Sequence, residues 1–357
     1  MKRPVLFVNA CTSVWGAEES MLELAEELDS LGYEPRLMTC SDELELAWRS
    51  RISGNPVYRV RTTQRETSVG RLLRTVSFGI RIASVPTQRV VIFSHYLLPV
   101  AAIVRARGIF SRQAPPRVVF DVHDNLSTPR AAFVTRVFVR FVDEIIVVSQ
   151  FTAGHLPPHR PRTRVIHSSI EATKPARRNA AGDAFVCGLV GRIDPEKKHH
   201  LVIQAIADLP NVYLDIRGSA AVAGQSYADA VASAALAILG NRVRLSGRVP
   251  RDQVLDGLDV LIVANAEEPM GRTVGEAQLA GIPVITPDAG GSAELVEHEV
   301  TGLTYPAGDA IGLRKAIERL RLDPTLRTEL TSRAKVAADA RHDLSKYARD
   351  YAAAFGD

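Results

Sequence analysis

The sequence predicts an α/β protein built from two doubly wound domains. Short apolar runs alternate with amphipathic runs along the whole chain, which is typical of parallel strands joined by helices. At 357 residues the chain exceeds the size at which a single hydrophobic core stops growing. A polar stretch at residues 171–183 interrupts the alternation near the middle, and we interpret it as a linker.

The first half of the chain carries the patterns of one domain. Apolar bursts predict strands at residues 4–10, 35–40, 57–61, 90–95, 117–123, 144–149 and 164–167. The runs between them predict helices at residues 17–31, 42–51, 69–84, 97–107 and 130–142. We therefore expect residues 1–172 to form an N-terminal Rossmann-like domain.

The same alternation restarts after the linker. The strand patterns lie at residues 184–191, 212–218, 243–247 and 260–264, and helix patterns start at His199 and cover residues 226–239. These patterns predict a second Rossmann-like domain at residues 173–341, facing the first across a cleft. A helical pattern at residues 342–357 is expected to form a last helix that packs back on the first domain.

The composition is that of a globular protein without a membrane-spanning segment. The longest apolar run, residues 96–104, is far shorter than the roughly 20 residues of a membrane span. The first residues run into a strand pattern without a signal-peptide core, so we expect a cytoplasmic protein. Cys11, Cys40 and Cys187 are odd in number and scattered among apolar runs, which favours buried free thiols over disulfides or a metal site.

The net charge of +4 is unevenly distributed. Residues 1–172 hold 22 Lys and Arg against 16 Asp and Glu. Two helical runs alternate apolar residues with arginines, which are Arg71, Arg74, Arg81, Arg130, Arg136 and Arg140. Such helices either lie peripherally on the inner face of a membrane or pack on a sheet with their arginines outward, and we favour the second arrangement. No zinc-finger, RNP-like or basic-zipper pattern is present, so a nucleic-acid partner is not expected.

Two carboxylates, Glu268 and Glu276, lie eight positions apart between an apolar strand and a Gly-Ile-Pro-Val-Ile run. Glu268 should lie at the carboxyl edge of a parallel sheet, where open α/β folds bind ligands, and Glu276 about two turns into the following helix. Gly271 allows a close backbone approach, and the N–H groups of Arg272 and Thr273 at the helix start suit a phosphate. One carboxylate could then face a sugar and the other a ribose.

A second loop carries two cations. Arg192 and Lys197 follow the strand that ends at Gly191, so both should lie at that strand's carboxyl end and could bind a diphosphate. Neither a Walker Gly-x4-Gly-Lys-Ser/Thr nor a Gly-x-Gly-x-x-Gly fingerprint occurs, which disfavours an ATPase and an NAD enzyme.

Polar residues also end strands of the first domain. Gly16 permits close approach at the start of the first helix, ahead of two acidic residues that suit a helix N-terminus. His95 and His123 each end a strand, and His123 is the better candidate for contact with a polar substrate. Because no Gly-x-Ser-x-Gly, His-Glu-x-x-His or Asp-x-Asp pattern occurs, we expect neither a serine nucleophile nor a metal or other cofactor.

The order of these motifs resembles the retaining family 4 glycosyltransferases of the GT-B fold. The motifs are Gly16-Ala-Glu18, Val122-His123-Asp124, Val147-Val148-Ser149, Gly191-Arg192 with Lys197, Ser246-Gly247-Arg248-Val249, Glu268 to Glu276, Gly281-Ile-Pro-Val, Gly290-Gly291 with Glu294, and Gly302-Leu. The resemblance covers nearly the whole chain.

The resemblance implies a nucleoside-diphosphate sugar, with UDP as the commonest nucleotide, held mainly by the C-terminal domain as a substrate rather than a cofactor. Arg192 and Lys197 would hold the diphosphate, Glu276 the ribose, and Glu268 the hydroxyls of the transferred sugar. His123 would contact the sugar, Gly16 the phosphate and acceptor, and the backbone at Arg248 the base. Attack on the face from which the diphosphate departs would retain the anomeric configuration without an enzyme nucleophile or a metal ion.

Four positions depart from the family pattern. Trp15 stands where a glycine is common, and Asn265 and Met270 replace a commoner serine and phenylalanine around the sugar. Lys198 stands where a glycine usually follows the lysine, so either Lys197 or Lys198 is expected to reach the phosphate.

Other functions remain open at this point. A nucleotide-sugar epimerase with two Rossmann domains and a catalytically silent nucleotide-sugar-binding protein share the donor site. The hydroxyl acceptor could be a lipid-linked sugar, a small metabolite, an antibiotic aglycone or a growing polysaccharide, and the sequence predicts no oligomeric state.

Overall fold

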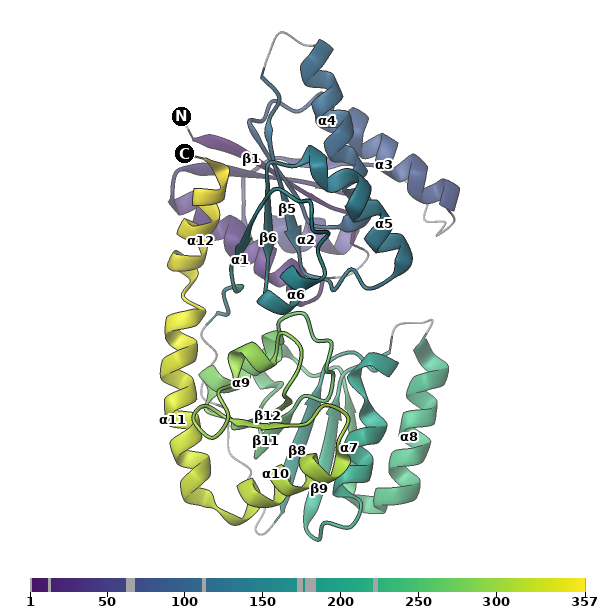
Figure 1. Ribbon diagram of the computed structural model, residues 1–357, viewed down its shortest axis with the longest axis vertical. Coiled ribbons are helices and arrows are strands. Elements are labelled where there is room, and N and C mark those ends of the chain that lie inside the picture. The colour runs from purple at the N-terminus through teal and green to yellow at the C-terminus, as the bar shows by residue number, and fades with distance from the viewer. Residues whose placement is uncertain are drawn as a thin grey trace. The chain divides into compact units, whose positions relative to one another are not determined.

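The chain divides into two α/β units, each built on one parallel sheet, as the sequence predicts (Figure 1). The computed structural model describes residues 2–11, 14–61, 68–110, 114–171, 176, 184–220 and 224–356. The first unit comprises Met1–Ser169 and Asp343–Asp357, and the second comprises Ile170–His342. Most of the predicted linker, residues 172–175 and 177–183, lies outside the described residues.

The first unit contains a seven-stranded parallel sheet with the order β3-β2-β1-β4-β5-β6-β7. The strands are β1 (Arg3–Asn9), β2 (Tyr33–Thr39), β3 (Val57–Arg59), β4 (Arg89–Ile92), β5 (Arg117–Val122), β6 (Glu144–Val147) and β7 (Arg162–Val165). The helices are α1 (Gly16–Ser30), α2 (Asp42–Arg51), α3 (Ser68–Ala83), α4 (Pro99–Phe110), α5 (Pro129–Phe138), α6 (Gln150–Gly154) and α12 (Leu344–Ala352), with short 3₁₀ turns η1 (His95–Leu97), η2 (Val139–Phe141) and η8 (Ala353–Phe355).

Two hydrophobic cores lie on the two faces of this sheet. Successive side chains of a strand point to opposite faces, so Leu6 and Val8 of β1 enter one core while Val5 and Phe7 enter the other. Helices α3, α4 and α5 contribute to the first core, and helices α1, α2 and α12 contribute to the second. Burial on both faces explains why the strands are almost continuously apolar in sequence.

The second unit contains a six-stranded parallel sheet with the order β10-β9-β8-β11-β12-β13. Its strands are β8 (Phe185–Val190), β9 (Val212–Arg217), β10 (Val243–Gly247), β11 (Val260–Ile262), β12 (Val284–Pro287) and β13 (Leu303–Tyr305). Its helices are α7 (His199–Ile206), α8 (Gln225–Leu239), α9 (Arg272–Ala280), α10 (Ala310–Leu322) and α11 (Pro324–Arg341), with 3₁₀ turns η3 (Pro195–Lys197), η5 (Gly240–Arg242), η6 (Arg251–Gln253) and η7 (Ala293–Leu295).

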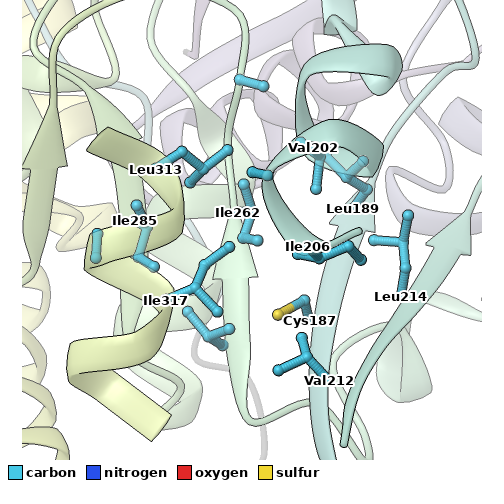
Figure 2. Close-up of a cluster of buried hydrophobic side chains, with 14 of the residues drawn as sticks. Cys187, Leu189, Val202, Ile206, Val212, Leu214, Ile262, Ile285, Leu313 and Ile317 are labelled. Atoms are coloured by element: carbon cyan, nitrogen blue, oxygen red, sulfur yellow. The ribbon is translucent and has the colours of Figure 1, made fainter. Parts of the chain in front are cut away.

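One core of the second unit lies between the sheet and helices α7 and α10. Figure 2 shows Cys187 of β8 and Ile262 of β11 among side chains from these helices, including Ile206 and Ile317. Cys187 is fully buried, as predicted, whereas Cys11 and Cys40 are only half-buried because they lie just after strands β1 and β2 rather than within them. All three thiols are free.

Several predicted boundaries differ from the structure. The helix predicted at residues 97–107 starts at Pro99, because proline suits the first turn of a helix, and the residues before it form η1. The helix predicted at residues 130–142 ends at Phe138 and continues only as the tight turn η2. None of the helices in the described ranges is long and apolar enough to cross a membrane.

The structure predicts that one tryptophan contributes strongly to the stability of the first unit. Trp48 of α2 is fully buried, and its ring centroid lies 5.9 Å from that of Phe7. Trp48→Ala should lower the free energy of unfolding by about 3–5 kcal/mol, because it removes a large apolar side chain and leaves a cavity. Leu46→Ala on the same helix is the matched control, since Leu46 is 72% exposed and its loss should change stability by less than about 0.5 kcal/mol. Equal effects of the two substitutions in urea unfolding would contradict the assigned core.

Candidate functional site

The order of strands in the second sheet reverses between β8 and β11. The chain builds outward from β8 through β9 to β10, and then places β11 on the other side of β8. In open parallel sheets the loops at the carboxyl ends of such neighbouring strands diverge and leave a crevice for ligands. The loop after β8 carries the predicted cations, and the loop after β11 carries the predicted carboxylate Glu268.

The loop after β8 depends on two glycines. Gly191 has a φ of 138°, and Gly218 after β9 has a φ of 154°. A β-carbon at Gly218 would lie 1.7 Å from the carbonyl oxygen of Gly191, so only glycine allows the two loops to approach this closely. Beyond this contact Asp194 caps η3, and the Nε of Arg192 lies 3.6 Å from the Asp194 carboxylate.

Lys197 and Glu268, which are 71 positions apart in sequence, form an ion pair at the carboxyl edge of the sheet. The Nζ of Lys197 donates to Oε2 of Glu268 at 2.6 Å, and the Nδ2 of Asn265 donates to the same oxygen at 3.1 Å. The side chains of Lys197 and Glu268 are 25% and 17% exposed, so both are shielded but reachable. Lys198 instead is exposed and adopts a left-handed backbone with a φ of 52°, where a glycine would be unstrained.

The Glu268 loop rests against a second pair of glycines, Gly290 and Gly291. The backbone N–H of Gly291 donates to the carbonyl oxygen of Glu268 at 2.7 Å. A β-carbon at Gly291 would lie 1.9 Å from the carbonyl oxygen of Pro269, and one at Gly290 would lie 2.7 Å from that of Ala266. The glycine pair therefore supports the loop that carries the carboxylate.

Glu276 forms ion pairs with two guanidinium groups. Helix α9 starts only at Arg272, because Gly271 caps it in a left-handed conformation with a φ of 85°. Glu276 is therefore just over one turn into the helix, and the predicted two turns is wrong. Its Oε1 lies 3.2 Å from the Nε of Arg272 and 3.6 Å from the Nη2 of Arg251.

The remaining predicted residues of the second unit lie on the same edge. Met270 and Gly271 are buried before α9, and Thr273 is half-buried in its first turn. Arg248 is exposed just after β10, and the carbonyl of the preceding Gly247 accepts a hydrogen bond from the N–H of Gly218 at 2.7 Å. Within the described ranges, no three His, Cys, Asp or Glu side chains gather closely enough to hold a metal ion.

The first unit places Gly16 at the start of α1. Glu18 accepts a hydrogen bond from the N–H of Trp15 at 3.1 Å and another from the Nδ2 of Asn9 at 3.3 Å. Burial raises the pKa of Glu18, although these hydrogen bonds oppose the shift. The helix start is thus fastened to the end of β1, while the intervening Thr12 and Ser13 lie outside the described residues.

His123 belongs to a chain of hydrogen bonds that the sequence did not reveal. Its Nε2 lies 3.0 Å from Oδ2 of Asp121, and the hydroxyl of Tyr351 on α12 donates to the same oxygen at 2.8 Å. Burial of the ring lowers the pKa of His123, but the carboxylates of Asp121, Glu18 and Asp124 outweigh it and raise the pKa. The strand period of two, which puts Asp121 and His123 on one face, is the signal that could have paired them.

His95 differs from His123. It is buried on η1, with its Nδ1 3.9 Å from the carboxylate of Asp124, and burial lowers its pKa. This histidine is neutral near pH 7, whereas His123 is held toward the protonated state.

Two family models match consecutive parts of the chain. The model described as "Glycosyltransferase Family 4" matches residues 14–174, and the model described as "Glycosyl transferases group 1" matches residues 171–337. The chain is similar to the lipopolysaccharide core biosynthesis glycosyltransferase LpsE of Rhizobium meliloti, with 30% identity over 53% of this chain and 51% of that protein. It is similar to the 2-deoxystreptamine glucosyltransferase of Streptomyces kanamyceticus, with 33% identity over 39% of this chain and 37% of that protein. The matched segments thus span about half or less of the length of these two relatives.

Solved structures match over almost the full chain. The structure of Anabaena Alr3699/HepE in complex with UDP and glucose has a TM-score of 0.81 and 23% identity, and covers 99% of both chains. The sucrose-phosphate synthase of Thermosynechococcus elongatus has a TM-score of 0.83 and 18% identity, and covers 99% of this chain and 98% of its own. Both similarities concern the fold.

The geometry around His123 predicts its response to loss of Asp121. Asp121→Asn should lower the pKa of His123, because it removes the nearest carboxylate while the ring stays buried. In the native protein the raised pKa adds stability below the ordinary histidine pKa of about 6.5, and this contribution is lost as the pH rises through the raised value. The stability difference between variant and native protein should therefore be largest at acid pH and shrink at alkaline pH.

Histidine side-chain NMR titration and urea unfolding at several pH values measure these two effects. Tyr351→Phe is the control, because it keeps the Asp121 carboxylate and should leave the pKa of His123 above its ordinary value. An unchanged His123 titration in Asp121→Asn is the result that contradicts the assignment.

Proposed function

The chain belongs to the group 1 and family 4 glycosyltransferases, and from this we propose that it moves a hexosyl-type sugar from a UDP-sugar to a hydroxyl acceptor with retention of configuration. The observation that carries the proposal is the Lys197–Glu268 pair at the switch point between β8 and β11. It puts a phosphate-binding cation beside a carboxylate that can accept hydrogen bonds from sugar hydroxyls. The structures of Anabaena Alr3699/HepE in complex with UDP and with UDP-glucose support uridine diphosphate as the donor nucleotide.

In this proposal the second unit binds the donor. Arg192 and Lys197 bind the diphosphate, and a lysine ammonium has three donors, so Lys197 can contact a phosphate oxygen while it keeps its bond to Glu268. The N–H groups of Arg272 and Thr273 at the start of α9 offer further contacts to the diphosphate. Glu268 then accepts hydrogen bonds from the transferred sugar.

The nucleoside is bound by residues of α9 and of the loop after β10. Glu276 accepts hydrogen bonds from the ribose hydroxyls while Arg272 and Arg251 neutralise its charge. The backbone at Arg248 contacts the base. Met270 and Gly271 contact the sugar of the donor.

The first unit supplies the contacts to the acceptor and the remaining contacts to the sugar. His123, fixed by Asp121 and Tyr351, hydrogen-bonds the sugar, and Gly16 allows the phosphate and acceptor to approach the start of α1. During transfer the bond between the anomeric carbon and the diphosphate oxygen breaks, and a bond to the acceptor oxygen forms on the same face. The acceptor proton passes to the departing diphosphate, whose charge Arg192 and Lys197 stabilise.

Removal of the Arg192 charge tests whether the loop after β8 stabilises the departing diphosphate. Arg192→Ala should lower kcat for donor hydrolysis by roughly 10²–10³, because loss of one preorganised charge partner costs about 2.7–4 kcal/mol in such sites. Arg333→Ala is a matched control, since Arg333 has 51% side-chain exposure against 50% for Arg192 and also lies beside a carboxylate. Near-normal turnover of Arg192→Ala would refute the assignment.

Substitutions of the two glutamates should change UDP affinity differently, and calorimetric titration with UDP measures this. Glu276→Gln should weaken UDP binding by roughly 10- to 150-fold, because a hydrogen bond to a charged group contributes about 1.5–3 kcal/mol. Glu268→Gln should keep UDP affinity and lose sugar transfer, because its partner is the sugar. Equal losses of UDP affinity would show that the division of roles is wrong.

The cations of the donor site should replace a metal ion in stabilising the departing diphosphate. We therefore expect enzyme treated with a chelator to retain most of its donor-hydrolysis activity without added magnesium or manganese. Activity that is abolished by the chelator and restored only by a divalent ion would contradict this mechanism.

A further inference from the structure

The helical layer on one face of the first sheet is unusually basic. Residues 68–142, which include α3, η1, α4 and α5, contain eleven arginines, no lysine and only two acidic residues. Their net charge of +9 exceeds the +4 of the whole chain. The rest of the chain therefore carries a net charge of −5, which offsets the charge of this segment only in part.

Some of these arginines have structural roles inside the unit. Arg105 pairs with Asp143 at 2.5 Å, Arg117 pairs with Glu144 at 2.8 Å, and Arg89 is buried with its guanidinium 5.7 Å from the ring centre of Tyr33. Four others have exposed side chains, and no carboxylate in the described part of the chain lies within ion-pair distance of them. They are Arg81, Arg130, Arg136 and Arg140. The side chains of Arg71 and Arg107, and the whole of Arg112, lie outside the described ones.

Large apolar side chains are exposed on the same elements. On α3, Leu73, Val76 and Ile80 are 55%, 40% and 67% exposed, and their spacing puts them on one stripe of the helix. Tyr96 of η1 and Phe133 of α5 are 47% and 66% exposed. Helix α3 packs on the sheet through Phe78 and Ile82 with Arg81 exposed, and its outer side carries these apolar side chains as well.

These residues belong to one continuous surface. The turn η1 contacts both α3 and α5, and the hydroxyl of Thr75 on α3 donates to the carbonyl of Tyr96 at 3.3 Å. Phe133 and Arg136 of α5 are exposed at helical spacing, and the exposed Arg140 follows on η2. We call the surface formed by the exposed side chains of α3, η1, α5 and η2 the arginine face.

We propose that the arginine face docks the protein on an anionic lipid membrane. Guanidinium groups without a carboxylate partner are attracted to lipid phosphates, and the interleaved apolar side chains can enter the boundary between headgroups and acyl chains. A second copy of the chain would present the same positive charge, so repulsion disfavours self-association through this face. The elements that form the face contain no Asp or Glu, and the exposed Asp124 lies at its border, 3.9 Å from His95 of η1. A mixed basic and apolar surface of this kind fits an anionic bilayer best.

The location of the face points to the acceptor class, an inference that rests on the proposed function. Turn η1 follows β4, and α5 follows the end of β5, where His123 lies. A membrane bound at the arginine face would therefore lie near the sheet edge to which we assign sugar and acceptor contacts. The acceptor is then a hydroxyl group carried by a membrane lipid rather than a freely diffusing metabolite.

Vesicle co-sedimentation of the full chain tests the proposal. Binding should occur with vesicles of phosphatidylcholine that contain about a third phosphatidylglycerol and not with phosphatidylcholine alone. Binding should fall between about 0.1 M and 1 M salt, because the Debye length shrinks from about 10 Å to about 3 Å. The triple substitution Arg81→Gln, Arg136→Gln and Arg140→Gln should weaken binding about fivefold for each charge removed, and roughly a hundredfold in total.

A matched triple control removes three exposed arginines elsewhere. Arg49 and Arg349 lie on α2 and α12, which cover the opposite face of the same sheet, and Arg333 lies on α11 of the second unit. Replacing these three by Gln should leave vesicle binding close to that of the native protein. Leu73→Ser with Ile80→Ser should weaken binding at both salt concentrations, because it removes the apolar contribution.

Three results would overturn the proposal: no binding to anionic vesicles at 0.1 M salt, equal binding of the two triple variants, or a dimer that Ile80→Ser dissociates. UDP affinity and donor hydrolysis of the arginine-face variants in solution should equal those of the native protein. Donor hydrolysis by Arg192→Ala tests the donor site, and vesicle binding tests the arginine face. Because the two assays are independent, failure of one proposal can be distinguished from failure of the other.

Discussion

The ion pair between Lys197 and Glu268 is the interaction around which the candidate donor site is arranged. It joins the loops that follow β8 and β11, the two neighbouring strands between which the order of strands in the sheet reverses. Around these loops, Gly218, Gly290 and Gly291 let backbone segments approach more closely than any side chain would permit, and Gly191 adopts a positive φ that favours glycine. The strand order brings the two loops to one edge of the sheet, the glycines allow their backbones to pack closely, and the ion pair connects their side chains.

The two units use charge in different ways. At the edge of the second sheet two candidate cations lie beside carboxylates, Arg192 beside Asp194 and Lys197 beside Glu268. Such pairs keep partly buried charges compensated until an anionic ligand arrives, which avoids the large cost of an unpaired buried ion. On the arginine face of the first unit, by contrast, exposed guanidiniums lack carboxylate partners among the described residues, and exposed charges without partners are suited to long-range attraction.

The sequence predicted most of the fold because parallel strands buried on both faces leave a strong apolar pattern. It also predicted that Lys197 and Glu268 lie at one edge, because motifs that follow parallel strands end on the same side of the sheet. It could not predict that Tyr351 reaches Asp121, since these residues are 230 positions apart and their pairing depends on how α12 packs. The exposure of Leu73 and Ile80 was equally hidden, because α3 is apolar on more than one side and only packing decides which stripe faces the sheet.

Thermal unfolding in the presence of nucleotides measures whether the carboxyl edge of the second sheet binds a nucleoside diphosphate. A ligand at about 100 times its Kd stabilises the protein to which it binds by about 2.7 kcal/mol. We expect UDP to raise the melting temperature of the native chain, uridine without phosphates to leave it unchanged, and Lys197→Ala to reduce the UDP effect. If no nucleoside diphosphate stabilises the native chain, the assignment of this edge as the donor site is wrong.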